Sequence, residues 1–210
     1  MFWLKHSAIW CCNFVLMGRQ AMASVHASQG NGSSDNQQIP KNSSPDRVAI
    51  FIDGANLFYA ALQMQIEVDY GRLLAVLTQG RQLLRAYFYT GVDPHNDRQQ
   101  GFILWMQRHG YRVVTKDLIS MADGSKKANL DIEIAIDMMR LAQHCDTLIL
   151  LSGDGDLAYA VNAITYQGVR VEVVGLRSMT SDSLVTVADY YQDLARLKTK
   201  IAKPKESGMA

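Results

Sequence analysis

The chain has 210 residues, of which 48% are hydrophobic and 20% are charged. A chain of this length and composition can bury one sizeable core, so we expect one α/β domain with an appendage rather than two domains. Lys and Arg number 21 against 20 Asp and Glu, which leaves a formal net charge of +1. This balance excludes a protein that holds nucleic acid through a diffuse basic field, so any such binding must come from a local patch.

The first 46 residues differ in composition from the rest of the chain. Residues 28–46, "SQGNGSSDNQQIPKNSSPD", are too polar to bury the apolar surface that ordering requires, which predicts a linker. Before them, "AIWCCNFVLM" loosely imitates a signal peptide. The alternatives are a wrongly assigned start, with Met17 or Met22 as the real one, or a weakly ordered extension. We therefore treat residues 1–46 as an N-terminal extension and disordered linker.

Two further properties bear on location. No segment reaches the roughly 18 apolar residues of a membrane span, so we expect no membrane partner. Cys11, Cys12 and Cys145 show no C-x-x-C spacing, and we interpret them as the reduced thiols of a cytoplasmic protein.

From residue 47 onward, short apolar runs alternate with longer segments of helical periodicity. This alternation predicts βαβ units, a parallel sheet and right-handed crossovers. We expect five strands in the order 3-2-1-4-5, with strands one and four as neighbours, as in doubly wound sheets. In chain order the predicted elements are strand 47–52, helices 56–65 and 70–79, strand 83–89, helix 96–110, strand 111–116, helix 129–144, strand 147–151, helix 156–168 and strand 169–175.

Aspartates follow two of the predicted strands directly. Asp53 comes after the first strand, and Asp154 and Asp156 come after the fourth. A single aspartate at such a place is often only a helix N-cap. Two neighbouring strands that end this way would bring three carboxylates together at the edge where ligands bind in open α/β sheets. Carboxylates that close repel one another unless a cation lies among them.

The helix at 129–144 carries a fourth carboxylate of interest, Asp131. At 100° per residue its apolar side chains cover one broad arc, while Glu133, Asp137 and Arg140 share the opposite face, which we expect to face solvent. Asp131 lies in the middle of the apolar arc, where a carboxylate is costly unless it is paired or binds a metal. Lys127, four residues earlier, is the alternative partner for Asp131. The arc is formed by Ile132, Ile134, Ala135, Ile136, Met138, Met139, Leu141 and Ala142.

These four aspartates, with Asn56 nearby, make an all-oxygen ligand set. Hard oxygen ligands favour Mg²⁺ or Mn²⁺. The usual work of such a site is phosphoryl transfer to water. The chain contains neither a G-x-x-x-x-G-K-[ST] nor a G-x-S-x-G motif, so nucleoside triphosphatase and serine hydrolase functions lack their sequence support.

Several motifs together resemble the NYN domain of the PIN-like nuclease superfamily, in its LabA-like bacterial branch. They are "IFIDGANLFYA", "VDYGRLLAVL", "KKANLDIEIAIDMM" and "DTLILLSGDGDLAYAV", and they occur in the expected order. The resemblance implies a PIN-like Rossmannoid three-layer sandwich over residues 47–195 and a metal-dependent ribonuclease site. By motif it assigns Asp53, Asn56, Asp131, Asp154 and Asp156 to that site. Leu157 departs from the pattern, because family members usually carry a bulky aromatic residue there.

Our leading hypothesis is a metal-dependent endoribonuclease that acts on single-stranded RNA, with the four aspartates as metal ligands. Beside them we expect contacts to the substrate from Asn56, Ser152, Lys116, Lys126, Lys127 and Arg177. Residues 196–210 are expected to form a basic flexible tail.

Two other hypotheses stay open. One is a regulatory NYN module that binds RNA, nucleotide or protein without turnover, and a homodimer or protein partner is open as well. The other is a TOPRIM-like site, which expects a Glu at the end of strand one, where this chain has Asp53.

Overall fold

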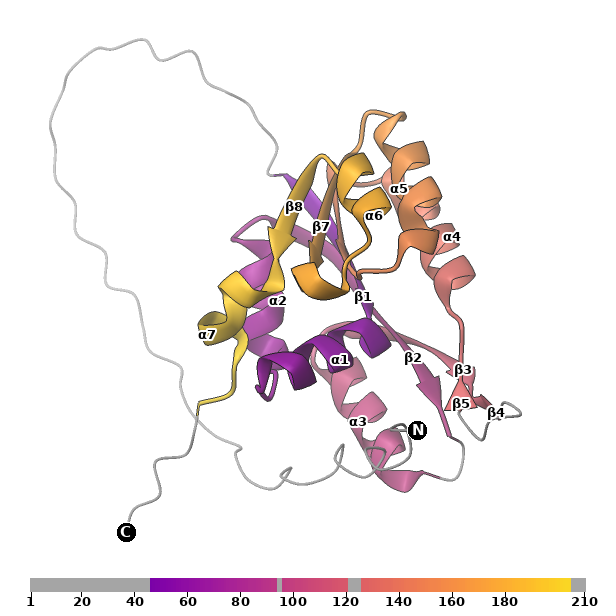
Figure 1. Cartoon of the computed structure of the whole chain (residues 1–210), viewed down its shortest axis with the longest axis vertical. Helices are drawn as coiled ribbons and strands as arrows, with labels where there is room; N and C mark the ends of the chain where they lie inside the picture. The colour runs from indigo at the N-terminus through magenta and orange to yellow at the C-terminus, as the bar shows by residue number, and fades with distance from the viewer. Residues whose placement is uncertain (1–45, 94–95, 121–125, 205–210) are drawn as a thin grey trace, which may run out of the picture. The chain divides into compact units, whose positions relative to one another are not determined.

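A six-stranded parallel sheet forms the centre of the molecule, in the order β3-β2-β1-β6-β7-β8 (Figure 1). The structure is a computed structural model that describes residues 46–93, 96–120 and 126–204. The predicted order of the first five strands is confirmed, but their number is wrong by one, because a sixth strand extends the sheet. The six strands are β1 (Arg47–Asp53), β2 (Gln82–Val92), β3 (Tyr111–Asp117), β6 (Thr147–Leu151), β7 (Arg170–Gly175) and β8 (Tyr190–Asp193).

Helices cover both faces of this sheet, which makes the predicted three layers (Figure 1). One face packs against α1 (Gly54–Met64), α2 (Tyr70–Thr78), α3 (Asp97–Arg108) and α7 (Lys198–Ile201). The other packs against α4 (Asp131–Ala142), α5 (Ala158–Thr165) and α6 (Asp182–Val187). A short antiparallel pair, β4 (Ile119–Ser120) with β5 (Lys126–Lys127), lies outside the sheet. The described residues also form the 3₁₀ turns η2 (Gly155–Leu157), η3 (Arg177–Met179) and η4 (Leu194–Leu197).

The central strand β1 shows why the sheet is sandwiched. Val48 to Ile52 are fully buried, and alternate side chains pack into opposite layers. Ile50 and Ile52 contact the layer of α1, α2 and α3, whereas Ala49 and Phe51 contact the layer of α4, α5 and α6. A strand covered on both faces needs such a continuous apolar run, since neither face meets water. The buried strands that we expected from composition are therefore present.

The C-terminal segment corrects one expectation. The flexible tail predicted for residues 196–210 is wrong for its first part, because the chain forms η4 and α7, and Leu194, Leu197 and Ile201 are buried in the core. Their spacing of three and four residues puts all three on one side of the helical turns. Neighbouring lysines dominate the composition of this segment and obscure that apolar spacing. The last part of the predicted tail, residues 205–210, lies outside the described residues.

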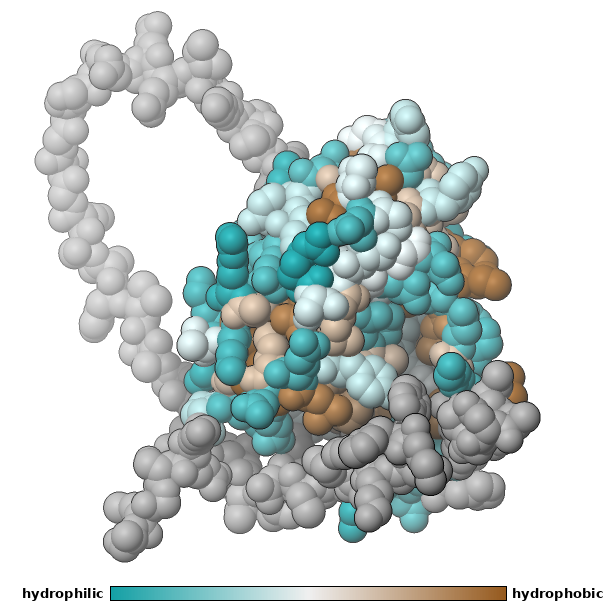
Figure 2. Space-filling model, viewed as in Figure 1, coloured by the Kyte–Doolittle hydropathy of each residue, from teal (hydrophilic) through white to brown (hydrophobic). Residues whose placement is uncertain are grey.

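Helix α4 packs the centre of its predicted apolar arc, Ile134, Met138 and Ala142, into the core, but the two flanks of the helix differ from the prediction. Glu133 and Asp137 lie beside the sheet, where Glu133 pairs with Lys116 and Asp137 accepts a hydrogen bond from the hydroxyl of Tyr89. On the other flank of the helix, Ile132 is 67% exposed, and Ile136 and Met139 are also exposed. The helical wheel gave an apolar arc, but the partners on β2 and β3 decide which flank turns inward. Figure 2 shows hydrophobic surface at the right-hand edge, over the place of α4 in Figure 1.

Two sequence predictions about the chain as a whole have different outcomes. Within the described part of the chain, no helix combines the length and the apolar character needed to cross a membrane. The extension and linker predicted for residues 1–46 fall, apart from Asp46, outside the described residues.

Candidate metal site at the carboxyl edge of the sheet

Three carboxylates from separate parts of the chain meet at the carboxyl edge of the sheet. Asp154 and Asp156 follow β6, and Asp131 is the first residue of α4. Each offers an oxygen, and these oxygens lie within 4.8 Å of one another. The convergence predicted from the strand ends and the helix start is therefore present for Asp131, Asp154 and Asp156.

Asp53 lies beside this trio, but hydrogen bonds hold its carboxylate. It is the N-cap of α1, and its Oδ1 accepts from the backbone N–H groups of Ala55 and Asn56, at 3.0 and 3.1 Å. Its Oδ2 accepts from the Asn56 side-chain amide and from the Ser152 hydroxyl, both at 3.2 Å. The alternative of a helix cap is thus realised in Asp53. Its charge is close enough to raise the pKa of Asp131, but Asp53 is not among the three carboxylates whose oxygens meet within 4.8 Å, and its role as a metal ligand stays a prediction.

Asn56 and Ser152 connect the ends of β1 and β6. The Oδ1 of Asn56 accepts from the backbone N–H of Gly153 at 3.1 Å. The Ser152 hydroxyl accepts from the backbone N–H of Asp154 at 3.1 Å while it donates to Asp53. Ser152 is 0% exposed, so it does not lie open to a substrate. The burial of Ser152 thus speaks against the predicted contact with substrate, whereas the contact predicted for Asn56 stays a prediction. The hydrogen bonds of both residues position the acids.

Replacing Asn56 by Ala is expected to lower the free energy of unfolding by about 1–2 kcal/mol, because it leaves the Gly153 N–H without its partner and removes one of the two donors to Oδ2 of Asp53. Urea denaturation measures the change. Gln63→Ala is the matched control, since Gln63 lies on the same helix and makes one exposed hydrogen bond, to Ser178. We expect that control to change stability by less than about 0.5 kcal/mol. Equal losses in the two variants would contradict the positioning role of Asn56.

The acidic edge carries negative charge that no described basic side chain neutralises through an ion pair. Burial, followed by the charges of Asp154 and Asp53, raises the pKa of Asp131, while a hydrogen bond with Asn129 opposes the shift. Among the described residues, no Lys or Arg forms an ion pair with Asp131, Asp154 or Asp156. Hard oxygen donors with uncompensated charge fit a divalent cation such as Mg²⁺ or Mn²⁺.

The basic residues expected to contact substrate differ in how many of their donor groups already bind other residues of the chain. Lys116 donates to the Asn129 carbonyl at 2.9 Å and to Glu133 at 2.8 Å, so it ties β3 to the start of α4. Arg177 pairs with Asp182 and donates to the Thr180 carbonyl at 3.1 Å.

The other two predicted cations, Lys126 and Lys127, lie on β5. Lys127 is exposed and forms no ion pair with Asp131 within the described parts of the chain, so the alternative pairing of these two residues is wrong. Of the four cations, Lys127 is therefore the one whose described contacts leave it available to a phosphate. For Lys126 the structure describes only the backbone.

The loop after β7 packs against the turn that follows β6, and the sequence analysis did not predict this contact. The backbone N–H of Ser181 donates to the Gly153 carbonyl at 3.0 Å. A Cβ on Gly155 would meet the hydroxyl oxygens of Ser181 and Ser183 at 2.8 and 3.1 Å. The only indication in the sequence was that these serines follow the carboxyl end of a predicted strand, the edge where the acids also lie.

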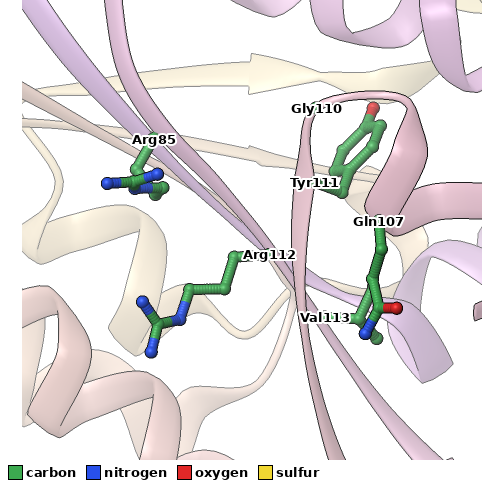
Figure 3. Close-up of a pocket in the computed structure, with 6 residues that line it drawn as sticks. All are labelled: Arg85, Gln107, Gly110, Tyr111, Arg112 and Val113. Carbon is green, nitrogen blue, oxygen red and sulfur yellow. The ribbon is translucent and has the colours of Figure 1, made fainter. Parts of the chain in front are cut away.

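A separate hollow of about 410 Å³ lies at the opposite end of β3. Figure 3 shows Arg85 and Arg112 on one side of the strands, with Gln107 on the other. Its lining includes Tyr111, the first residue of β3, whose length of about 20 Å separates this end from the carboxyl edge. The hollow contains none of the predicted site residues.

The fold and the acidic edge define a three-layer α/β protein with a carboxylate cluster at the carboxyl end of a parallel sheet. The chain belongs to the NYN domain family, because the family model matches residues 47–195. It is 36% identical over 167 residues to the low amplitude and bright protein LabA of Synechococcus elongatus. That alignment covers 76% of this chain and 89% of the LabA protein. The crystal structure of VPA0982, a protein of unknown function from Vibrio parahaemolyticus, aligns with a TM-score of 0.66 and 27% identity, covering 76% of this chain and 97% of the other.

Proposed function

We propose that the protein is a metal-dependent ribonuclease that hydrolyses phosphodiester bonds of single-stranded RNA. The observation that carries this proposal is the trio of carboxylates within 4.8 Å of one another. Membership in the NYN domain family supports a nuclease-type or RNA-related function. The raised pKa of Asp131 supports it further, because burial and then the charges of Asp154 and Asp53 raise it, and a bound cation would offset both effects.

Each part of the site has a distinct role in this proposal. Asp131, Asp154 and Asp156 would hold Mg²⁺ or Mn²⁺, and Asp53 lies beside them as a further oxygen donor. Such an ion, when bound, lowers the pKa of water and offsets negative charge on a phosphate. Asn56 and Ser152 keep the ends of β1 and β6 in register, which fixes the spacing of the acids. Lys127, which is exposed and precedes Asp131 by four residues, would contact a backbone phosphate.

Labelled single-stranded RNA, incubated with the full chain in Mn²⁺ or Mg²⁺, is expected to be cleaved, and a chelator should stop the reaction. Asp156→Asn, purified in the same way, is the control for contaminating nuclease. Asp156 is exposed, and its side chain accepts no hydrogen bond from the described residues, so this variant should fold normally. Cleavage that persists unchanged in this variant or in chelator would overturn the proposal.

A second candidate is a regulatory NYN module that binds RNA, nucleotide or protein without turnover. Lys116 pairs with Glu133, and Arg177 pairs with Asp182. These ion pairs favour the regulatory candidate, because they leave the two cations fewer free donors for a substrate phosphate. RNA binding without cleavage in the same assay would support this candidate. A homodimer or a protein partner remains a prediction. So does a cytoplasmic location, with which the free and buried thiol of Cys145 agrees.

A further inference from the structure

The two most exposed large aromatic side chains of the described residues lie on one helix. Tyr159 is 84% exposed and Tyr166 is 83% exposed, and both belong to the outer face of α5 and its C-terminal end. They are seven residues apart, which separates them by about 10 Å along the helix. No other described ring or cation lies against Tyr159, and the exposed fraction of 84% leaves most of its ring accessible.

Their distances from the acidic cluster differ. The turn η2, which contains Asp156, continues directly into α5. Side chains three residues apart on a helix are neighbours, with Cβ atoms about 5–6 Å apart, so Tyr159 stands next to the exposed carboxylate of Asp156. Leu157, Ala160 and Val161 are buried on the other side of the same turns and fix its position. Tyr166 lies two turns further away.

An open aromatic ring beside a phosphate-handling site suits a nucleobase. Stacking of a base on an aromatic side chain accepts any base, since every base has a flat apolar face. It requires a base whose face is free, and the bases of a double helix are already stacked on one another. A ring in this place would therefore hold the nucleotide beside the phosphate and discriminate against duplex RNA.

We propose that Tyr159 stacks on an unpaired RNA base that flanks the phosphate held at the acidic cluster. This inference rests on the proposed ribonuclease function and deepens it, because it names the residue that would select an unpaired strand. Stacking supplements the electrostatic contacts, which are few in a chain of formal charge +1. Three or four phosphate contacts correspond to a log–log salt slope of roughly −2 to −3 for a single strand.

The test measures binding of a short labelled oligouridine in Mn²⁺ by the full chain, with phosphorothioate linkages in the oligouridine so that the strand resists cleavage. Tyr159→Ala is expected to weaken binding by about 5- to 100-fold. Tyr159→Phe keeps the ring and should stay within about twofold of the parent, as should the matched control Tyr166→Ala.

The salt slope separates stacking from a change of charge. Tyr159→Ala should leave the slope unchanged, because no phosphate contact is lost, whereas Lys127→Ala should reduce it by about one unit or less. Binding of a blunt RNA duplex should be insensitive to Tyr159→Ala.

Three results would overturn the inference in distinguishable ways. If the parent binds RNA but Tyr159→Ala binds equally well, stacking at Tyr159 fails and the proposed function stands. If Tyr166→Ala weakens binding as much as Tyr159→Ala, the effect belongs to the outer face of α5 as a whole, and a specific contact at Tyr159 beside the acidic cluster fails. If the parent binds no RNA, the proposed function fails together with the inference. Melting temperatures of all variants should agree, since both tyrosine side chains are exposed.

Discussion

Asp154→Asn is expected to abolish RNA cleavage and to leave the fold intact. Loss of one of three clustered carboxylates should reduce the cleavage rate by at least about 1,000-fold, which corresponds to about 4 kcal/mol of barrier. The backbone N–H of Asp156 now donates to Oδ1 of Asp154 at 2.9 Å, and the Asn side chain keeps an oxygen there. The turn should therefore form as before. Cleavage of labelled RNA in Mn²⁺ measures the loss.

The same variant should be more stable than the parent when no metal is present. Removing one of the crowded charges relieves repulsion with Asp131 and Asp156. We expect a rise in melting temperature of roughly 2–4 °C without metal, as for a gain of about 1 kcal/mol in a chain of this size. The further rise on adding Mn²⁺ should shrink, because stabilisation by a ligand depends on its affinity.

Asp97→Asn is the matched control for both measurements, since Asp97 is an exposed acid in the first turn of α3. It should leave cleavage and the Mn²⁺ shift as they are in the parent. An unfolded Asp154→Asn protein would mean that Asp154 serves the fold as a cap rather than the site.

Gly153→Ala is expected to lower the free energy of unfolding by about 3 kcal/mol, and to disturb the acidic edge with it. A Cβ at this position would lie 2.2 Å from the carbonyl oxygen of Met179 and 3.1 Å from Oδ1 of Asn56. Both neighbours are fixed, the first as backbone and the second by its hydrogen bond to the Gly153 N–H. The strand end or the loop after β7 must therefore shift, which is the cost of overpacking. Urea denaturation measures the loss.

Gly101→Ala provides the opposite control. Gly101 lies inside α3, and a Cβ there would meet no atom within 4 Å. Alanine is the better helix former, so this variant should gain about 0.5–1 kcal/mol. Equal stability of the parent and Gly153→Ala would show that the turn after β6 can relax, contrary to the close approach of Met179.

The sequence was sufficient to predict the sheet and the meeting of the acids. Apolar runs such as Val48 to Ile52 can only be buried on both faces, and helices between them impose parallel strands. Once β1 and β6 are neighbours, aspartates that follow them share one edge. Each of these steps depends on the chain's own pattern and on general rules of sheet geometry.

What escaped prediction depends on partners that are distant in sequence. The inward flank of α4 is set by Lys116 and Tyr89 on other strands, which a helical wheel does not include. The hydrogen bonds of Asn56 and Ser152 join residues about 100 positions apart. The sequence does not reveal such pairs, so the positioning role of these two residues could not be predicted. Strand β8 is short and only partly buried, so its pattern was too weak to detect.

The central position of β1 also bears on how the chain folds as it is made. Residues 48–52 pair on one side with β2, about 35 residues later, and on the other with β6, about 100 residues later. At a synthesis rate of roughly 5–20 residues per second, that second edge stays open for about 5–20 s on the ribosome. An unpaired and wholly apolar strand edge is the kind of surface that joins another chain. The interval of greatest aggregation risk thus closes only when β6 arrives, carrying Asp154 and Asp156 into place.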